Sequence, residues 1–443
     1  MHAPVTPRTI LHLAWPIVLA NAAVPLLGLV DTAVIGNTGN VSALGAIGLG
    51  ALVFSFLFWG FGFLRMGTTG FTAQAAGRGD PAEVRATFAR ALMLAGVLGS
   101  GLVLLQVPLG RAALALLGAQ PDVEALTEAY LRIRIWAAPA SLGVFAVLGS
   151  LIGLGKTRQV LVTQVFLNGV NIALDVLFAG VFGWGVRGIA LGTALAEWST
   201  LVVGCGLLVR VFQAERTDSE PFWPRARILD RGAARAMMSA NADIMIRTLF
   251  LLLGFGWFTN QGARFGNDIL AANHVLMQLV TLSAYLLDGY AHATEILVGR
   301  AVGTARVDAF DRAVRLSTWM AALTAIVLAT LVLLLGTPLV HVLTDLPDVR
   351  TVAVRHLPWT ALYVALSFAA FQLDGVFIGA TGTRAMRNAS VLSCLVFLVL
   401  SLPLARWGGN TGLWLAFVTF VVARALTLWR RYPALRARVR MRG

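Results

Sequence analysis

Charged side chains are scarce in this sequence of 443 residues. They make up 13% of it, whereas a soluble protein of this length carries roughly 25%. The hydrophobic fraction is 58% and the mean hydropathy is +0.78. Apolar runs of about 20 residues recur from end to end, and each is long enough to cross a hydrocarbon core of about 30 Å. The shortage of charge argues against a soluble globular protein and predicts an all-α polytopic membrane protein.

Cysteine and the common catalytic motifs are also nearly absent. Cys205 and Cys394 are the only cysteines, and both lie in apolar runs, which indicates small buried residues rather than a disulfide or a metal site. The sequence has no P-loop, no G-x-S-x-G and no H-E-x-x-H. It therefore gives no support to ATP hydrolysis or a familiar enzyme chemistry, and we expect no catalytic residue, metal centre or cofactor.

The sequence repeats itself at an interval of 226 residues. Matching segments include Ile152–Gly153 with Ile378–Gly379 and Pro121–Val123 with Pro347–Val349. An internal duplication in so apolar a chain is typical of transporters, in which two membrane bundles rock against each other around a central site.

Twelve membrane spans are predicted, six in each half. Their approximate ranges are 9–37, 44–68, 87–108, 127–152, 160–182, 188–211, 234–260, 269–295, 313–336, 353–380, 386–405 and 411–430. A stretch with prolines and several charges separates the halves. The sequence therefore predicts a six-helix N-terminal lobe at 1–211, a cytoplasmic linker at 212–233 and a six-helix C-terminal lobe at 234–443.

Arginine and lysine are distributed unevenly among the alternate loops. With the N-terminus in the cytoplasm, 25 of them lie on the inner side and 6 on the outer side. Because cytoplasmic loops carry the excess of positive charge, we expect both termini in the cytoplasm and the chain in the cytoplasmic (inner) membrane. This distribution accounts for the net charge of +14 without a nucleic-acid partner. Six spans is an even number, so the two halves share one orientation and form parallel repeats.

Ionisable residues inside the spans mark candidate functional positions, because each costs about 2.5–3.5 kcal/mol at the membrane centre unless it has a partner, water or a function. They are Asp31, Asp175, Glu197, Asp243, Arg247, Asp288, Glu295 and Asp374.

The first cluster of these residues belongs to the N-terminal half alone. Asp31, Asp175 and Thr193 fall at similar depths, about 7–12 Å below the outer surface. Asn171 lies one turn before Asp175 on the same helical face. Burial and mutual repulsion of two carboxyl groups favour proton binding near neutral pH. The same oxygens also suit Na⁺, and a polar network that only holds helices together is a third interpretation. Glu197, one turn from Thr193, is either a further member or a partner.

The C-terminal half offers a different set of charges, placed deeper. Arg247 lies near the middle of its span, one turn from Asp243, and an i, i+4 pair between them would neutralise itself. The alternative is that Arg247 changes partner between Asp288 and Asp374 as a cavity opens. In the first span, Pro16 removes a backbone hydrogen bond and predicts a hinge below the N-terminal cluster.

Several motifs in fixed order now resemble a known family. They are LLGLVDTAVIG around Asp31, the turn Gly77–Asp80, IGLGKTRQ and NIALDVLFAG. With ADIMIRTLFLLLGFGWFTNQGARFGNDILAANHVLMQ and AYLLDGYAHATEILVGRAVG, they resemble the MATE family of multidrug and toxic-compound extrusion transporters, and its DinF branch in particular. The resemblance covers essentially the whole chain.

The resemblance implies an antiporter that exports lipophilic, often cationic, small molecules in exchange for inward H⁺ or Na⁺ by rocking alternating access. We expect it to act as a monomer among membrane lipids. In the family, the aspartate matched by Asp31 takes part in cation coupling. Asn171, Asp175 and Thr193 match the residues that accompany it, and Pro16 matches the family's bending proline. The branch and the paired carboxylates favour H⁺ over Na⁺.

One departure and one alternative accompany the resemblance. The NorM branch uses an aspartate that Asp374 matches and a glutamate in the seventh span, where this chain has Asp243 and Arg247 instead. The departure argues against a Na⁺ site in the C-terminal half. The alternative function is a lipid-linked oligosaccharide flippase of the same architecture, whose cavity usually carries several cationic residues, whereas the sequence offers mainly Arg247.

Overall fold

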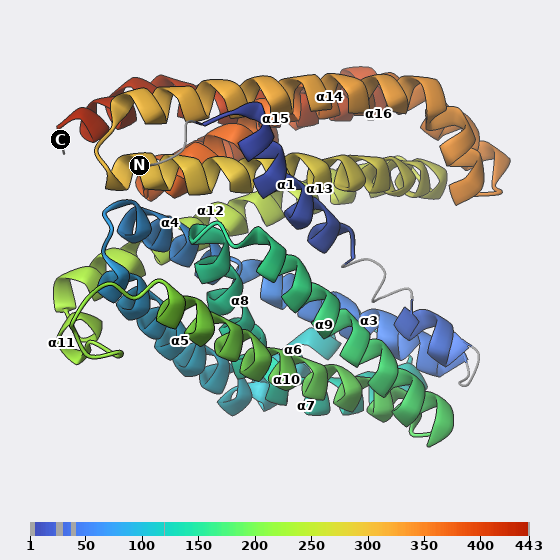
Figure 1. Cartoon of the computed structure of the whole chain (residues 1–443). Coiled ribbons are helices and arrows are strands. Elements are labelled where there is room, and N and C mark those ends of the chain that lie inside the picture. The colour runs from blue at the N-terminus through green and yellow to red at the C-terminus, as the bar shows by residue number, and fades with distance from the viewer. Residues whose placement is uncertain (1–4, 24–29, 37–40, 119, 442–443) are drawn as a thin grey trace. The chain divides into compact units, whose positions relative to one another are not determined.

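The computed structural model describes residues 5–23, 30–36, 41–118 and 120–441, and every regular element in these ranges is a helix (Figure 1). Ten continuous helical segments are long and apolar enough to cross a membrane. They are Val41–Gly77, Pro81–Leu104, Pro121–Gly153, Thr157–Val181, Gly185–Ala214, Arg231–Ala263, Asn267–Gly303, Val307–Leu343, Pro347–Gly379 and Thr383–Arg440.

Two features reconcile these ten segments with twelve spans. Helix α1 (Pro7–Ala22) and the helical residues 30–36 both lie within the predicted first span, and neither is long enough by itself to cross a membrane. Helix α16 (Thr383–Arg440) is two helices joined at Gly409, whose φ of 56° and ψ of −136° are not helical. Across the described ranges, the prediction of an all-α membrane protein with twelve spans is confirmed.

Residues 19–238 form one compact unit. Its elements are α3 (Val41–Gly60), α4 (Phe63–Gly77), α5 (Pro81–Leu104), α6 (Gln106–Leu117), α7 (Pro121–Arg134), η1 (Ile135–Ala137), α8 (Ala138–Gly153), α9 (Thr157–Asp175), η2 (Val176–Val181), α10 (Gly185–Ala214) and α11 (Arg225–Ile228). Helix α8 packs against α4, α5 and α10. A Cβ atom at Gly149 of α8 would lie 2.5 Å from the carbonyl oxygen of Arg65 in α4, so glycine permits this close helix contact.

Residues 1–18 and 239–443 form the other unit. It contains most of α12 (Arg231–Ala263) together with α13 (Asn267–Gly303), α14 (Val307–Leu343), α15 (Pro347–Gly379) and α16. The first part of α1 packs on α13, where a Cβ atom at Gly289 would lie 2.4 Å from Val18 and 3.1 Å from the carbonyl oxygen of Ala14. The structure therefore groups residues 1–18 with the C-terminal unit, whereas the repeat alone placed them in the N-terminal lobe. The chain passes from one unit to the other within α1 and within α12.

The predicted linker folds onto the unit 19–238 through a buried arginine. Arg85 of α5 has a side chain that is 0% exposed, and it donates hydrogen bonds of 2.8 and 2.9 Å to the two carboxylate oxygens of Asp218. It donates a third of 2.7 Å to the carbonyl oxygen of Phe222. The Arg85 guanidinium holds the pKa of Asp218 below its usual 3.8. This stretch of the linker is thus fixed to one unit.

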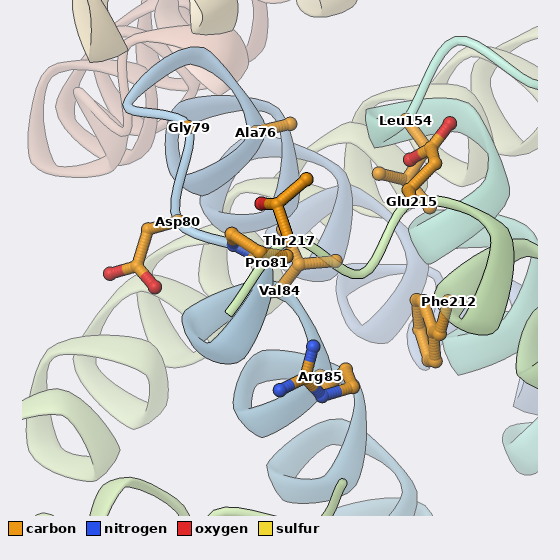
Figure 2. A pocket seen from close by; sticks show the side chains of 10 residues that line it. All are labelled: Ala76, Gly79, Asp80, Pro81, Val84, Arg85, Leu154, Phe212, Glu215 and Thr217. Atoms are coloured by element: carbon orange, nitrogen blue, oxygen red, sulfur yellow. The ribbon is translucent and has the colours of Figure 1, made fainter. Parts of the chain in front are cut away.

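Further ion pairs hold the rest of the linker. Arg227 pairs with Asp80 at 2.7 Å and with Glu220 at 2.6 Å, while Lys156 pairs with Glu215 at 2.6 Å. A cavity of about 150 Å³ remains between the linker and the ends of α4, α5, α8 and α10 (Figure 2). It is lined by Ala76, Gly79, Asp80, Pro81, Val84, Arg85, Leu154, Phe212, Glu215 and Thr217.

Candidate functional site

Two of the predicted coupling residues meet inside the unit 19–238. Asp31 lies in the helical stretch 30–36, and Asp175 is the last residue of α9 before the π-helical turn η2. The side chains are nearly enclosed, since Asp31 is 7% exposed and Asp175 is 0% exposed. Their carboxyl groups lie close enough to interact electrostatically. A π-helical turn directly after Asp175 is a feature often found at functional sites.

The acid pair has few other partners. No described group donates a hydrogen bond to either carboxyl oxygen of Asp175 or to Oδ1 of Asp31. Two facing carboxyl groups form a hydrogen bond only when one of them carries a proton, because two carboxylates repel each other and have no donor. The arrangement can therefore hold a shared proton, or, with the same oxygens, a hard cation.

A glycine makes room for this pair. A Cβ atom at Gly192 of α10 would lie 2.5 Å from Oδ1 of Asp175 and 3.3 Å from its backbone nitrogen. Any larger residue would displace the carboxyl group or separate α9 from α10. Gly192 is thus a site residue that the sequence analysis did not identify, because one glycine among 45 carries no signal of its own.

The predicted amide and hydroxyl residues lie on the same two helices. Asn171 of α9 donates a hydrogen bond of 3.1 Å to the hydroxyl of Thr193 in α10, and that hydroxyl donates one of 2.9 Å to the carbonyl oxygen of Ile189. Oδ1 of Asn171 is buried and has no described partner. One turn earlier, Asn168 donates to the carbonyl oxygen of Ala23 at 2.9 Å and ties α9 to the chain after α1.

A buried ion pair stands beside the acids. Arg134, at the end of α7, donates to both carboxylate oxygens of Glu197 in α10, one of them at 3.0 Å. Ser141 of α8 donates to the same carboxylate. Arg134 lies within electrostatic reach of Asp31 and Asp175. Glu197 therefore acts as the partner of Arg134.

Aromatic rings enclose that guanidinium. The Arg134 group lies 5.0 Å from the ring centre of Phe54 and 5.5 Å from that of Phe58, which is a cation–π arrangement. Tyr130, one turn earlier on α7, lies close enough to interact electrostatically with Arg134. Arg134 was not among the candidate residues predicted from the sequence, although it lies in the predicted span 127–152. The available signal was a positive charge inside one apolar run, which needs a partner, together with the negative charge of Glu197 inside another.

The charges of the other unit form pairs that differ from the simplest expectation. Arg247 of α12 pairs with Asp374 of α15, and the i, i+4 pair with Asp243 does not form. Asp243 instead accepts 2.7 Å and 2.9 Å hydrogen bonds from Arg387 and Thr383 of α16. The helical spacing between Asp243 and Arg247 permitted a contact, but side chains of neighbouring helices supply better-placed partners.

The remaining predicted residues are also located. Asp288 is half-buried on α13, within electrostatic reach of Tyr285, and Pro16 is a buried residue inside the continuous helix α1. The part of the chain that the structure describes contains no group of three or more His, Cys, Asp or Glu side chains that would hold a metal ion.

Comparison with known proteins yields one consistent result. The family model described as MatE matches residues 16–177 and 245–404, one segment in each half of the repeat. The chain is 38% identical to "DNA damage-inducible protein F" of Escherichia coli over 433 residues, covering 96% of this chain and 92% of that protein. It is 28% identical to a "Probable multidrug resistance protein NorM" of Deinococcus radiodurans, covering 96% and 94%.

Solved structures share the fold. A structure described as "Crystal structure of MATE in the bent conformation" matches with a TM-score of 0.87 and 18% identity over 98% of this chain and 96% of that one. A second, of "MATE in the straight conformation", matches with a TM-score of 0.84 over the same shares.

Proposed function

Because the chain belongs to the MATE family, a family of membrane transporters and not of enzymes, we propose that it exports lipophilic, often cationic, small molecules in exchange for inward H⁺. The name of the NorM relative supports a multidrug range of substrates. The observation that carries the coupling proposal is the burial of two interacting carboxyl groups, those of Asp31 and Asp175.

The proposed coupling cycle uses the change in charge of this pair. With one proton between them, the carboxyl groups attract each other, and the helical stretch 30–36 is held against α9. When the proton leaves, the two carboxylates repel each other and the contact opens. Asn171 and Thr193 keep α9 and α10 in register during this change, so that the movement is confined to the stretch that carries Asp31.

H⁺ is proposed in preference to Na⁺ because a proton alone satisfies two facing carboxyl groups. Na⁺ would require further oxygen ligands. Asn171, four residues before Asp175, offers one of them, because its Oδ1 atom has no described hydrogen-bond partner. A purified sample tests the choice directly. We expect addition of a cationic dye to release protons to the same extent with and without Na⁺. Release that requires Na⁺, or efflux in vesicles that follows a Na⁺ gradient at fixed pH and ignores a pH gradient, would replace H⁺ with Na⁺ in the proposal.

The joints of the rocking movement are proposed to lie in α1 and α12. Pro16, which cannot donate a backbone hydrogen bond, lies two residues before the point in α1 where the chain leaves one unit for the other. The ion-paired linker moves with the unit 19–238. We further propose a monomer in the cytoplasmic membrane with both termini in the cytoplasm, because of the excess of arginine in the alternate loops. Cysteine accessibility of the two ends in intact cells measures that orientation.

A further inference from the structure

Three buried charged side chains meet in the unit formed by residues 1–18 and 239–443. Arg247 of α12 and Arg424 of α16 both point at the same carboxylate oxygen, Oδ2 of Asp374 in α15. Their side chains are 8%, 9% and 8% exposed. The two arginines are not equivalent, because Arg247 donates a hydrogen bond to Asp374 whereas Arg424 approaches it only to 3.8 Å.

Arg424 lacks the acceptors that a buried guanidinium needs. It donates no hydrogen bond to any described residue, and its Nε atom is enclosed without a partner. Nε of Arg247 is likewise enclosed and unpartnered. A guanidinium has five N–H donors, and leaving them unmet in a buried place is costly. The ring of Phe420, one turn before Arg424, belongs to an aromatic cluster and offers no strong acceptor.

Two other buried acids of this unit do not pair with Arg424. Asp243 is held by Arg387 and Thr383, and Glu295 of α13 lies 3.1 Å from the imidazole of His292. Asp374 supplies one negative charge to two guanidinium groups. The group of three therefore carries one positive charge in excess, in a place of low dielectric where charge is felt strongly.

We propose that Arg247 and Arg424 form a subsite for the anionic group of a small organic molecule, a carboxylate or a phosphate. Guanidinium groups bind both through paired N–H donors, and the two terminal nitrogens of Arg424 donate no hydrogen bond to a described residue. An anion bound there would pair with Arg424, while Arg247 would keep its hydrogen bond to Asp374. The proposal extends the substrate range beyond cations to compounds that carry an acidic group.

Binding to the purified protein in neutral detergent tests the subsite. The probes are benzoate and phenyl phosphate, with benzylamine as a cation of similar size, and the readout is the shift of the thermal unfolding midpoint as each probe is titrated. We expect saturable stabilisation by both anions and none by benzylamine. Arg424→Gln should abolish that response, because it removes the guanidinium that has no other acceptor.

Two variants separate anion binding from a structural effect. Arg436→Gln removes a guanidinium from the same helix at an exposed pair with Asp311, and it should respond to the anions as the parent does. Asp374→Asn removes the competing carboxylate, so the anions should bind about tenfold more tightly. Equal responses of Arg424→Gln and the parent, or weaker binding by a folded Asp374→Asn, would overturn the proposal.

A further experiment distinguishes two sources of the anion, a lipid headgroup and a soluble compound. In nanodiscs of phosphatidylcholine, phenyl phosphate should bind as in detergent; if added phosphatidylglycerol displaces it, the anion is a lipid headgroup, and if not, it is a soluble compound. The subsite does not depend on the coupling ion. If anions bind but the protein exchanges no protons, the result contradicts the proposed function and not the subsite. If the protein exchanges protons but binds no anion, the result contradicts the subsite and not the proposed function.

Discussion

Asn171 donates a 3.1 Å hydrogen bond to the hydroxyl of Thr193, and this contact joins α9 and α10 one turn from Asp175. Thr193→Val keeps the shape of the side chain but leaves the Asn171 amide without its acceptor. We expect a loss of roughly 1 kcal/mol in stability and a larger loss of proton-coupled efflux. Thr193→Ser retains the hydroxyl and should restore both. Equal efflux by the valine and serine variants would show that the contact is only structural.

Replacing the first carboxyl group tests coupling without disturbing the fold. Asp31→Asn keeps the size and hydrogen-bonding capacity of the side chain but cannot exchange a proton. It should therefore be produced and inserted normally, with an unfolding midpoint close to that of the parent, and lose efflux in vesicles that have a pH gradient. Transport at the parental rate would remove Asp31 from the mechanism.

Gly192 offers a test of the space around the second carboxyl group. Gly192→Ala would place a methyl group 2.5 Å from Oδ1 of Asp175, so the carboxyl group must move. We expect efflux to fall by at least about tenfold, the rate effect of roughly 1.4 kcal/mol. Gly206→Ala on the same helix is the matched control, since a Cβ atom there meets nothing within 4 Å, and it should leave efflux unchanged. If both variants transport equally well, the close approach has no role in coupling.

The ion pair beside the acids should be structural as well as electrostatic. Arg134→Gln leaves Glu197 buried without its partner and should cost roughly 3–5 kcal/mol in unfolding measurements. The double variant Arg134→Gln/Glu197→Gln should recover most of that loss. Arg132→Gln is the control, because Arg132 is 70% exposed and pairs with Glu128 at the surface. A full loss in the double variant would contradict this assignment.

A double-mutant cycle identifies the partner of Arg247. Alanine substitutions at Arg247 and Asp374 should show an interaction energy of roughly 0.5–3 kcal/mol in thermal or denaturant unfolding. Substitutions at Arg247 and Asp243 should be nearly additive, because Asp243 is held by Arg387. If Arg247 shows an interaction energy with Asp243 and none with Asp374, the Arg247–Asp374 pair of the structure is contradicted.

The helical architecture was predictable because the length and the polarity of each span follow directly from its own residues. The twelve ranges follow from apolar runs that are long enough to cross a membrane. The grouping of residues 1–18 with the C-terminal unit was not predictable, since it depends on Gly289 receiving Val18 across a distance of more than 270 positions. Sequence periodicity indicates which face of a helix is apolar, but not which of several apolar helices will cover it.

The acidic residues of the candidate site were predictable from the sequence, whereas its arginines were not. Asp31 and Asp175 are visible because a carboxyl group in an apolar run is rare. Arg134 and Arg424 were not singled out from the sequence, although each lies inside a predicted span. The choice of Asp374 over Asp243 as the partner of Arg247 depends on side-chain reach between helices, on which helical spacing within one sequence gives no information.

The ion pair between Lys156 and Glu215 has a practical consequence, because Lys156 is the only lysine among the 443 residues. An amine-reactive fluorophore can attach to this side chain and to the N-terminus alone. Since its partner belongs to the segment that leads into α11, the emission of a dye at Lys156 would report whether that segment stays on the helix ends during transport. The protein thus carries its own labelling position for following the linker during transport, with no engineered cysteine required.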